Sequence, residues 1–181
     1  NGISTKQYKS RDWDSYRNHT IDFVFQSYNL IPHQTILSNV ELALTISGVS
    51  HSERRERARK ALEQVGLGEH VNKKPNQLSG GQMQRVAIAR TLALNPDVIL
   101  FDEPCSALDP ISTLAIEDLM SSIVADRAIV IVTHNMEQAS RVSNRTAFFY
   151  MGDMVEYDET DEIFQRPKDK RLNDYLTGMF S

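Results

Sequence analysis

The alternation of apolar and polar positions divides the chain into stretches with the period of strands and of helices. Apolar side chains at positions 21, 23 and 25 predict a strand that ends at Gln26 and is buried mainly on one face. The short apolar runs 98–101 and 128–132 predict further buried strands, and the second is of the β-branched kind that parallel sheets cover on both faces. Another strand is expected over 146–151.

Apolar positions three and four residues apart predict helices between these strands. The stretches 35–46 and 52–65 predict a mostly helical lobe, in which Gly66 ends the second helix. A third helix follows Ser79, and Asp109-Pro110 begins a fourth with a capping residue and a first-turn proline. A short helix is expected from about Leu172. The inner stripe of the fourth helix is expected to be Ile116, Leu119, Met120, Ile123 and Val124.

Strands that alternate with helices predict a three-layer α/β core with right-handed crossovers, here interrupted by the helical lobe. The 181 residues suffice for one well-packed domain, and the 40% hydrophobic and 24% charged composition is that of a soluble protein. No apolar run approaches the roughly 18 residues of a membrane span, so a membrane role would require a partner.

Charge and cysteine content narrow the function further. A formal net charge of −4 argues against nucleic acid as a ligand. Because Cys105 is the single cysteine, an internal disulfide and a multi-thiol metal site are excluded, and the reducing cytoplasm is the natural compartment.

Two carboxylates follow the strand at 98–101. Asp102 and Glu103 have the arrangement in which nucleotide hydrolases hold Mg²⁺ and polarise water at the carboxyl edge of a sheet. We expect Asp102 to reach the metal through water, and Glu103, which faces differently, to orient or deprotonate the attacking water. A strand that ends in Asp-Glu also occurs as a solvated edge or a helix cap.

His134 follows the next buried strand, so a parallel sheet would bring it to the same edge as the two carboxylates. A neutral imidazole there can hydrogen-bond a γ-phosphate and position the nucleophile. Histidines at strand ends are often structural, and it is the shared edge that favours a functional role.

The string Leu78-Ser79-Gly80-Gly81-Gln82-Met83-Gln84-Arg85 is the most specific in the chain. Ser79 is a good N-cap, Gly80 and Gly81 would let backbone amides approach a ligand, and the helix offers its positive end to an anion. A glycine-rich turn that opens a helix explains the glycines but not the whole string.

With these residues the chain resembles the ATP-binding cassette (ABC) family of ATPases. Residues 78–82 match its signature, Gln26 its Q-loop, Asp102 and Glu103 its Walker B motif, residues 106–109 its D-loop and His134 its switch. The resemblance implies a P-loop ATPase core of residues 1–26 and 87–181, a helical subdomain of residues 27–86, and ATP and Mg²⁺ as cofactors.

The resemblance also implies partners and roles. Two ATPase subunits would dimerise head to tail, with Ser79, Gly80, Gly81 and Gln82 meeting the ATP held by the other subunit. Gln26 would bind Mg²⁺ or water beside Asp102, and Asp109 would connect the two sites. Transmembrane permease subunits would rest on the helical lobe, which places the protein peripherally at the cytoplasmic face of the membrane.

The two halves of the chain resemble different transporters. Residues 25–32 and 76–82 are similar to ATPases of lipoprotein release and macrolide export, whereas residues 102–113, 147–152 and 174–178 are similar to the phosphate-import ATPase. Phosphate import is the leading interpretation, an exporter ATPase is the alternative, and a fusion of two genes would explain the two resemblances. A soluble cassette protein of DNA repair or translation would normally show paired cassettes or a long coiled coil, and neither is present.

The match departs from the family at its phosphate loop. No Gly-Lys-Ser or Gly-Lys-Thr precedes Gln26, and the chain opens on the turn dipeptide Asn1-Gly2. We therefore expect an N-terminally truncated core, and an inactive fragment is a further alternative. Asp22 also departs from the family, which often has glycine at this position of the strand.

Overall fold

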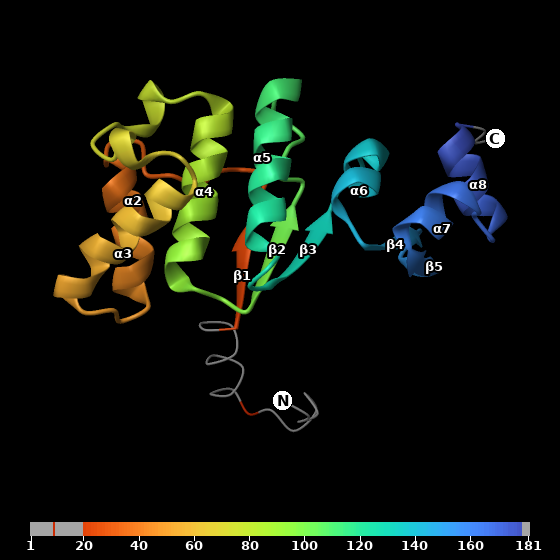
Figure 1. Cartoon of the computed structure of the whole chain (residues 1–181), viewed down its shortest axis with the longest axis horizontal. Helices are drawn as coiled ribbons and strands as arrows, with labels where there is room; N and C mark the ends of the chain where they lie inside the picture. Colours follow the sequence, from red (N-terminus) through yellow and green to blue (C-terminus); the bar gives the residue numbers. More distant parts are fainter. Residues whose placement is uncertain (1–8, 10–19, 179–181) are drawn as a thin grey trace. The chain divides into compact units, whose positions relative to one another are not determined.

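The computed structural model describes residue 9 and residues 20–178, which belong to two compact units that divide after Val132. Asn1 and Gly2, the predicted turn dipeptide, lie outside the described residues. In the first unit, β1 (Ile21–Val24), β2 (Val98–Asp102) and β3 (Ala128–Val132) form a parallel sheet in the order β1-β2-β3 (Figure 1). The three strands confirm the sequence prediction, although β1 ends two residues before Gln26.

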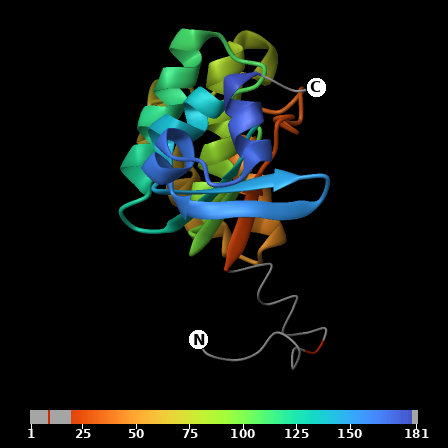
Figure 2. The ribbon, with the colours of Figure 1, turned by 90° about the vertical axis from the view of Figure 1, so that its right-hand side faces the viewer.

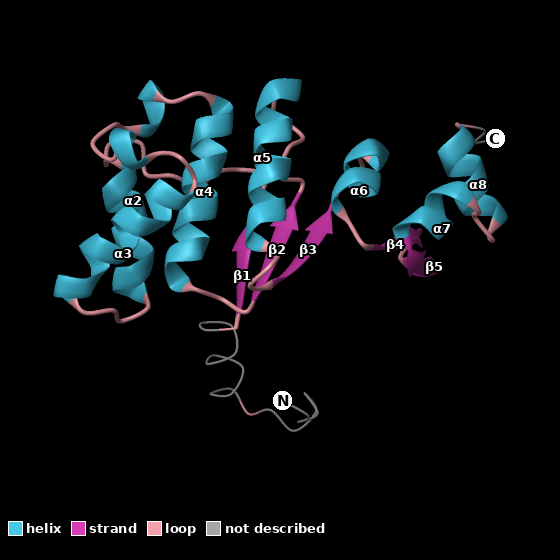
Figure 3. Ribbon diagram, viewed as in Figure 1, coloured by secondary structure: helices cyan, strands magenta, loops and turns pink. Residues whose placement is uncertain are grey.

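Helices α4 (Gly80–Leu94) and α5 (Pro110–Ile123) pack on one face of this sheet (Figure 3). Val24, Ile99 and Phe101 point into that layer and are at most 1% exposed. Side chains alternate along a strand, so the residues between them face the other way. The first unit thus presents two layers, a sheet and the helices on one of its faces.

Several side chains on the opposite face of the sheet are exposed. Phe23 and Phe25, which stack on each other, are 44% and 45% exposed, and Val130 and Val132 are 49% and 60% exposed. The apolar set at 21, 23 and 25 therefore lies on the face away from α4, and Val24 is the buried residue of β1. The expectation that both faces of the strand at 128–132 are covered was also wrong, because Val130 and Val132, which share one face of β3, are about half exposed or more.

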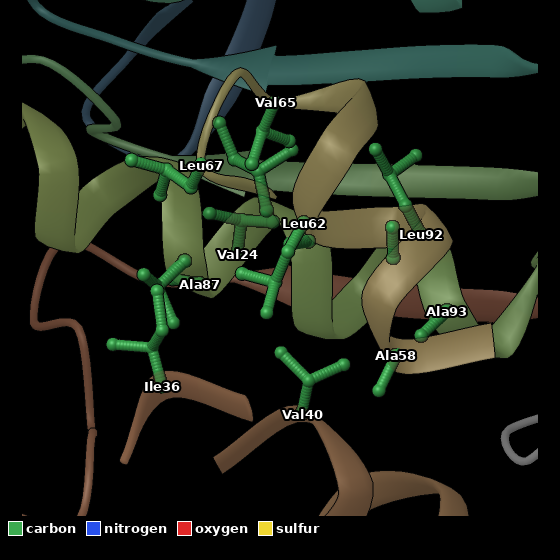
Figure 4. Packing of buried hydrophobic residues seen from close by; sticks show 14 of the residues in the cluster. Val24, Ile36, Val40, Ala58, Leu62, Val65, Leu67, Ala87, Leu92 and Ala93 are labelled. Atoms are coloured by element: carbon green, nitrogen blue, oxygen red, sulfur yellow. The ribbon is translucent and has the colours of Figure 1, made fainter. Parts of the chain in front are cut away.

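The helical lobe consists of α2 (Ile36–Ile46), α3 (His51–Gln64) and the short 3-10 helices η2 (Gly68–His70) and η3 (Pro75–Gln77). Thr35, the first residue of the predicted stretch, is the N-cap of α2, and Gly66 at φ +71° follows the end of α3, as predicted. Both helices pack against α4. Figure 4 shows the side chains that meet near Val24, among them Ile36, Val40, Ala58, Leu62, Ala87 and Leu92.

The predicted inner stripe of α5 is confirmed at three of its five positions, Ile116, Met120 and Ile123, which are buried. Leu119 is partly buried against the same core. Val124 is the C-cap of the helix and 47% exposed, so its assignment to the stripe was wrong.

The second unit begins with α6 (Met136–Val142) and continues with β4 (Arg145–Tyr150), β5 (Asp153–Glu159), α7 (Thr160–Gln165) and α8 (Lys170–Thr177). The strand expected at 146–151 is β4, and it pairs antiparallel with β5, which the sequence reasoning missed (Figure 2, blue). Met151 and Gly152, both at positive φ, make the two-residue turn between them. Among the residues that the structure describes, no helix has the length and apolar character needed to cross a bilayer.

Candidate active site

Asp102 and Glu103 lie where two strands end together. Asp102, the last residue of β2, pairs in register with Val132, the last residue of β3. The amide of Glu103 donates a hydrogen bond of 2.9 Å to the carbonyl of Val132. Asp102 is exposed and Glu103 half-buried, so both lie at the carboxyl edge of the sheet, as the sequence predicts.

The backbone of Glu103 is in the left-handed region, at φ +48°. This conformation costs a residue with a side chain on the order of 1–2 kcal/mol and is common at functional sites. The amide and the hydroxyl of Ser106 donate to the Glu103 carbonyl at 3.4 and 3.1 Å and support the turn. The change of backbone region at Glu103 ends the strand at Asp102.

The candidate metal ligands form no closed protein cage. Within residues 20–178, no group of three or more His, Cys, Asp or Glu side chains is placed to hold a metal ion. Mg²⁺ is usually bound by one or two carboxylates, with water and phosphate oxygens completing the shell. The exposed carboxylate of Asp102 fits such a site. Gln26, also exposed, lies two residues after β1, the neighbour of β2.

Ser79 is the N-cap of α4, as predicted. Its hydroxyl accepts the amide of Gln82 at 3.3 Å, and the Gln82 side-chain oxygen accepts the amide of Ser79 at 3.0 Å. The first turn is therefore fixed by a reciprocal capping box, and the amides of Gly80 and Gly81 are not part of it. Helix starts of this kind favour anionic groups, and the role of Ser79, Gly80 and Gly81 toward ATP stays a prediction.

Gly81 has a packing role that the sequence reasoning missed. A Cβ at this position would lie 2.7 Å from the hydroxyl oxygen and 2.8 Å from the Cβ of Ser112, on α5. Glycine is thus required here for the close approach of two helices, besides any approach of a ligand. Gly80 is less restricted, since its added Cβ would meet only the side-chain ends of Tyr28 and Leu108, at 3.2 and 3.4 Å.

Ser112 also binds the predicted D-loop residue. Asp109 caps α5, and its carboxylate accepts the amide of Ser112 at 3.0 Å and the hydroxyl at 2.6 Å. These hydrogen bonds hold the pKa of the Asp109 carboxyl below its usual value. Within the subunit, Ser112 connects the D-loop residue to the signature glycine. The predicted role of Asp109 across a dimer stays a prediction.

His134 lies two residues past the end of β3, in the second unit, and is exposed. Asn135, the next residue, caps α6 by accepting the amide of Gln138 at 2.9 Å. The function of His134 beside the carboxylates stays the prediction made from the sequence.

An open groove lies on the helical lobe, apart from the predicted site residues. It is lined by Gln34, Ser38, Glu41, Leu42, Thr45, His51 and Arg54, which belong to α2, to the start of α3 and to the turn before α2. Polar side chains dominate it, and Leu42 is 37% exposed.

The parallel sheet, the carboxylate pair at its edge and the capped glycine helix are together the arrangement of an α/β fold of the ATPase class. The sequence profile of the ABC transporter family matches residues 2–106. The chain belongs to this family.

Curated relatives agree with this assignment. The phosphate import ATP-binding protein PstB of Cytophaga hutchinsonii is 48% identical over 165 residues, which are 88% of this chain and 66% of that protein. The protein of the same name from Mycolicibacterium smegmatis is 47% identical over 172 residues, with shares of 89% and 67%. The chain thus spans about two thirds of the length of these relatives.

Solved structures show the same fold. A dimeric post-hydrolysis state of the ATP-binding cassette MJ0796 bound to ADP and Pi superimposes with a TM-score of 0.73 at 38% identity, covering 88% of this chain and 71% of that one. A second dimeric structure of MJ0796, described as a bacterial ABC transporter cassette, gives 0.72 at 40% identity, with 86% and 69% covered. The predicted α/β P-loop ATPase fold is confirmed.

Proposed function

We propose that the protein is the ATP-hydrolysing subunit of a transporter that imports inorganic phosphate. The observation that carries this proposal is the identity of 48% and 47% with two phosphate import ATP-binding proteins, over 88% and 89% of the chain. The site supports it, because Asp102 and the strained Glu103 lie together at the sheet edge, as hydrolysis of a nucleotide requires.

The chemistry follows from the residues. Bound Mg²⁺ would neutralise phosphate charge, with Asp102 and Gln26 holding it directly or through water. Glu103 accepts a proton from the attacking water as its oxygen bonds to the γ-phosphorus and the bond to the ADP oxygen breaks. His134 donates a hydrogen bond to the γ-phosphate and so positions it for attack.

The proposal includes a second ATPase subunit. Ser79, Gly80, Gly81 and Gln82 would meet the ATP of that subunit, with Asp109 near the dimer axis. The dimeric state of both MJ0796 structures supports this arrangement. In each subunit, residues 1–26 and 87–181 would form the ATPase core and residues 27–86 the helical subdomain.

Permease subunits are the proposed membrane partners. The open groove on α2 and α3 supports their docking on the helical lobe, because it offers polar side chains beside the exposed Leu42. Coupling through this lobe would hold the protein peripherally at the cytoplasmic face. Nucleic acid is not a proposed ligand, given the net charge of −4.

The test starts from the absence of a Gly-Lys-Ser or Gly-Lys-Thr sequence in residues 1–26. Without the lysine and amides of that loop, the 181-residue chain should neither hydrolyse ATP nor bind it tightly. Joining the phosphate-loop segment of the Cytophaga hutchinsonii protein to residue 1 gives a completed protein, which should hydrolyse ATP in the presence of Mg²⁺.

The completed protein should also restore phosphate uptake in cells that lack their own phosphate-import ATPase. ATP hydrolysis without restored uptake would favour the exporter alternative, which rests on residues 25–32 and 76–82. Turnover of ATP by the 181-residue chain alone would contradict the need for the loop, and an inactive completed protein would favour an inert fragment.

A further inference from the structure

The signature helix α4 holds the backbone on both sides of Gln26. On one side, the hydroxyl of Thr91 donates to the carbonyl of Phe23, in β1, at 3.4 Å. On the other side, the guanidinium of Arg90 donates to the carbonyls of Asn29 and Tyr28 at 2.9 and 3.3 Å. Two consecutive residues of one helix therefore fix both ends of the short segment that contains Gln26.

The chain beyond this segment is fixed to the helical lobe. Asn39 of α2 is 3% exposed, and its side chain accepts the amide of Ile31 at 2.7 Å and donates to the carbonyl of Ile31 at 3.2 Å. The phenol of Tyr28 lies at the first turn of α4, near Gly80. Phe25, Gln26 and Ser27, by contrast, are exposed.

Asp22 supports the arginine. Burial lowers the pKa of the Arg90 guanidinium, and the negative charge of Asp22 on β1 counteracts this effect. The aspartate that departs from the family pattern thus lies where it favours a charged, half-buried arginine. Its own carboxylate is oriented by accepting the amide of Phe23 at 2.8 Å.

We propose that Arg90 is a positioning residue, which fixes Gln26 relative to Ser79 by tying the backbone after Gln26 to the helix that begins at Ser79. An α-helix is stiff over the eleven-residue step from Ser79 to Arg90, so the anchor and the signature move together. The negative charge of Asp22 offsets part of the cost of burying the guanidinium. The inference depends on the proposed function only for what Gln26 binds, and the anchor itself can be tested without nucleotide.

The first test uses the 181-residue chain labelled with 3-fluorotyrosine, with the Tyr28 resonance assigned by Tyr28→Phe. Arg90→Ala should shift this ¹⁹F resonance and increase its solvent isotope effect, because the phenol loses its fixed place at Gly80. Arg90→Lys, which keeps the charge but not the two-pronged geometry, should give a smaller change, and Asp22→Asn a change in the same direction.

Arg57→Ala is the matched control, since Arg57 donates to another backbone carbonyl, that of Ala93 on α4, at 2.7 Å. It should leave the Tyr28 resonance in place. Amide exchange of Ile31 should rise about tenfold in Arg90→Ala and remain unchanged in the control. An unaltered Tyr28 signal in folded Arg90→Ala and Arg90→Lys proteins would overturn the proposal.

The second test uses ATP hydrolysis by the completed protein. Arg90→Lys should lower kcat about tenfold with little change in KM for ATP, and combining it with Gln26→Ala should add no further loss. Additive losses would overturn a positioning role through Gln26. If the parental protein were inactive, the proposed function would fail while the ¹⁹F result would still decide whether Arg90 is the anchor.

Discussion

Glu103 has a left-handed backbone conformation, which is sterically unfavourable for a residue with a Cβ atom. Glycine adopts this region readily, whereas an alanine pays nearly the same steric cost as glutamate. We expect Glu103→Gly to be more stable than Glu103→Ala by about 1 kcal/mol, measured by urea denaturation of the 181-residue chain. Both variants lack the carboxylate, so its contacts cancel in the comparison. Equal stabilities would mean that Glu103 is not strained.

The carboxylate itself is tested by a different substitution. Glu103→Gln preserves the shape of the side chain but cannot accept the proton of water. In the completed protein it should abolish hydrolysis while sparing ATP binding, measured by phosphate release and by nucleotide titration. Turnover near the parental rate would remove Glu103 from the role of base and direct attention to Asp102 and His134.

The lowered pKa of Asp109 predicts that the free energy of unfolding of the chain depends on pH. Since hydrogen bonds from Ser112 hold its folded-state pKa below the unfolded value, the cap contributes fully above the unfolded pKa of about 3.9 and is lost as the pH falls through the folded value. Asp109→Asn keeps an acceptor but does not titrate. From pH 7 to about pH 5 the parental chain should unfold at a higher urea concentration than Asp109→Asn. This difference in urea midpoint should become smaller below about pH 4. A constant difference would contradict this account.

At the scale of elements, the contact of α4 with α5 depends on Gly81. Gly81→Ala should destabilise the chain by about 1–3 kcal/mol, because its Cβ meets Ser112 at 2.7 Å. Ser112→Gly removes both clashing atoms and should recover most of the loss in a double-mutant cycle, whereas Ser112→Ala leaves the Cβ in place and should recover less. Gly80→Ala is the matched control, as it meets only side-chain ends that can move.

The helices were predictable because their signals are local. Thr35, Ser79 and Asp109 cap the helices that they were expected to begin, and Gly66 ends α3. The parallel strands were also predictable from their apolar runs. Which face of β1 is buried was not, because the sequence has apolar residues on both faces and only the packing of α4 selects Val24.

Tertiary contacts account for the other misses. β5 has mixed polar and apolar residues and depends on pairing with β4, although the Met151-Gly152 turn signals a hairpin. At the site, residue types predicted Asp102, Glu103 and Ser79. Arg90 was missed because its partners are backbone carbonyls 61 and 62 residues away, and Ser112 because its neighbour is a glycine on another helix; no short motif records such contacts.

At the scale of the whole molecule, the proposed dimer predicts that two variants, each inactive as a homodimer, restore ATP hydrolysis when they are mixed. Ser79→Arg places bulk at the helix start and should block dimer closure while leaving ATP binding by its own subunit nearly intact. Ser79 is the better position for this test than Gly81, where any side chain also disturbs α5. Its side chain is exposed, so an arginine fits there, although loss of the N-cap hydrogen bond to Gln82 should cost about 1 kcal/mol of stability.

Mixing Ser79→Arg with Glu103→Gln subunits of the completed protein gives one site with both defects and one with neither. Partial hydrolysis should therefore return, although each homodimer is inactive, and phosphate release from the mixture measures it. Mixed dimers that form but stay inactive would mean either that both sites must hydrolyse ATP together or that Ser79 does not meet the ATP of the other subunit. Loss of ATP binding by the Ser79→Arg monomer would show that Ser79 serves its own subunit.

The composition and exposure of strand β3 also predict whether the chain aggregates at high concentration. β3 reads Ala-Ile-Val-Ile-Val, without charge or proline, at the edge of the described sheet and with Val130 and Val132 about half exposed or more. Such edges pair with strands of neighbouring molecules and seed aggregates. The composition of β3 therefore predicts aggregation of the chain at high concentration, and Val130→Lys should reduce it by placing a charge on this edge strand.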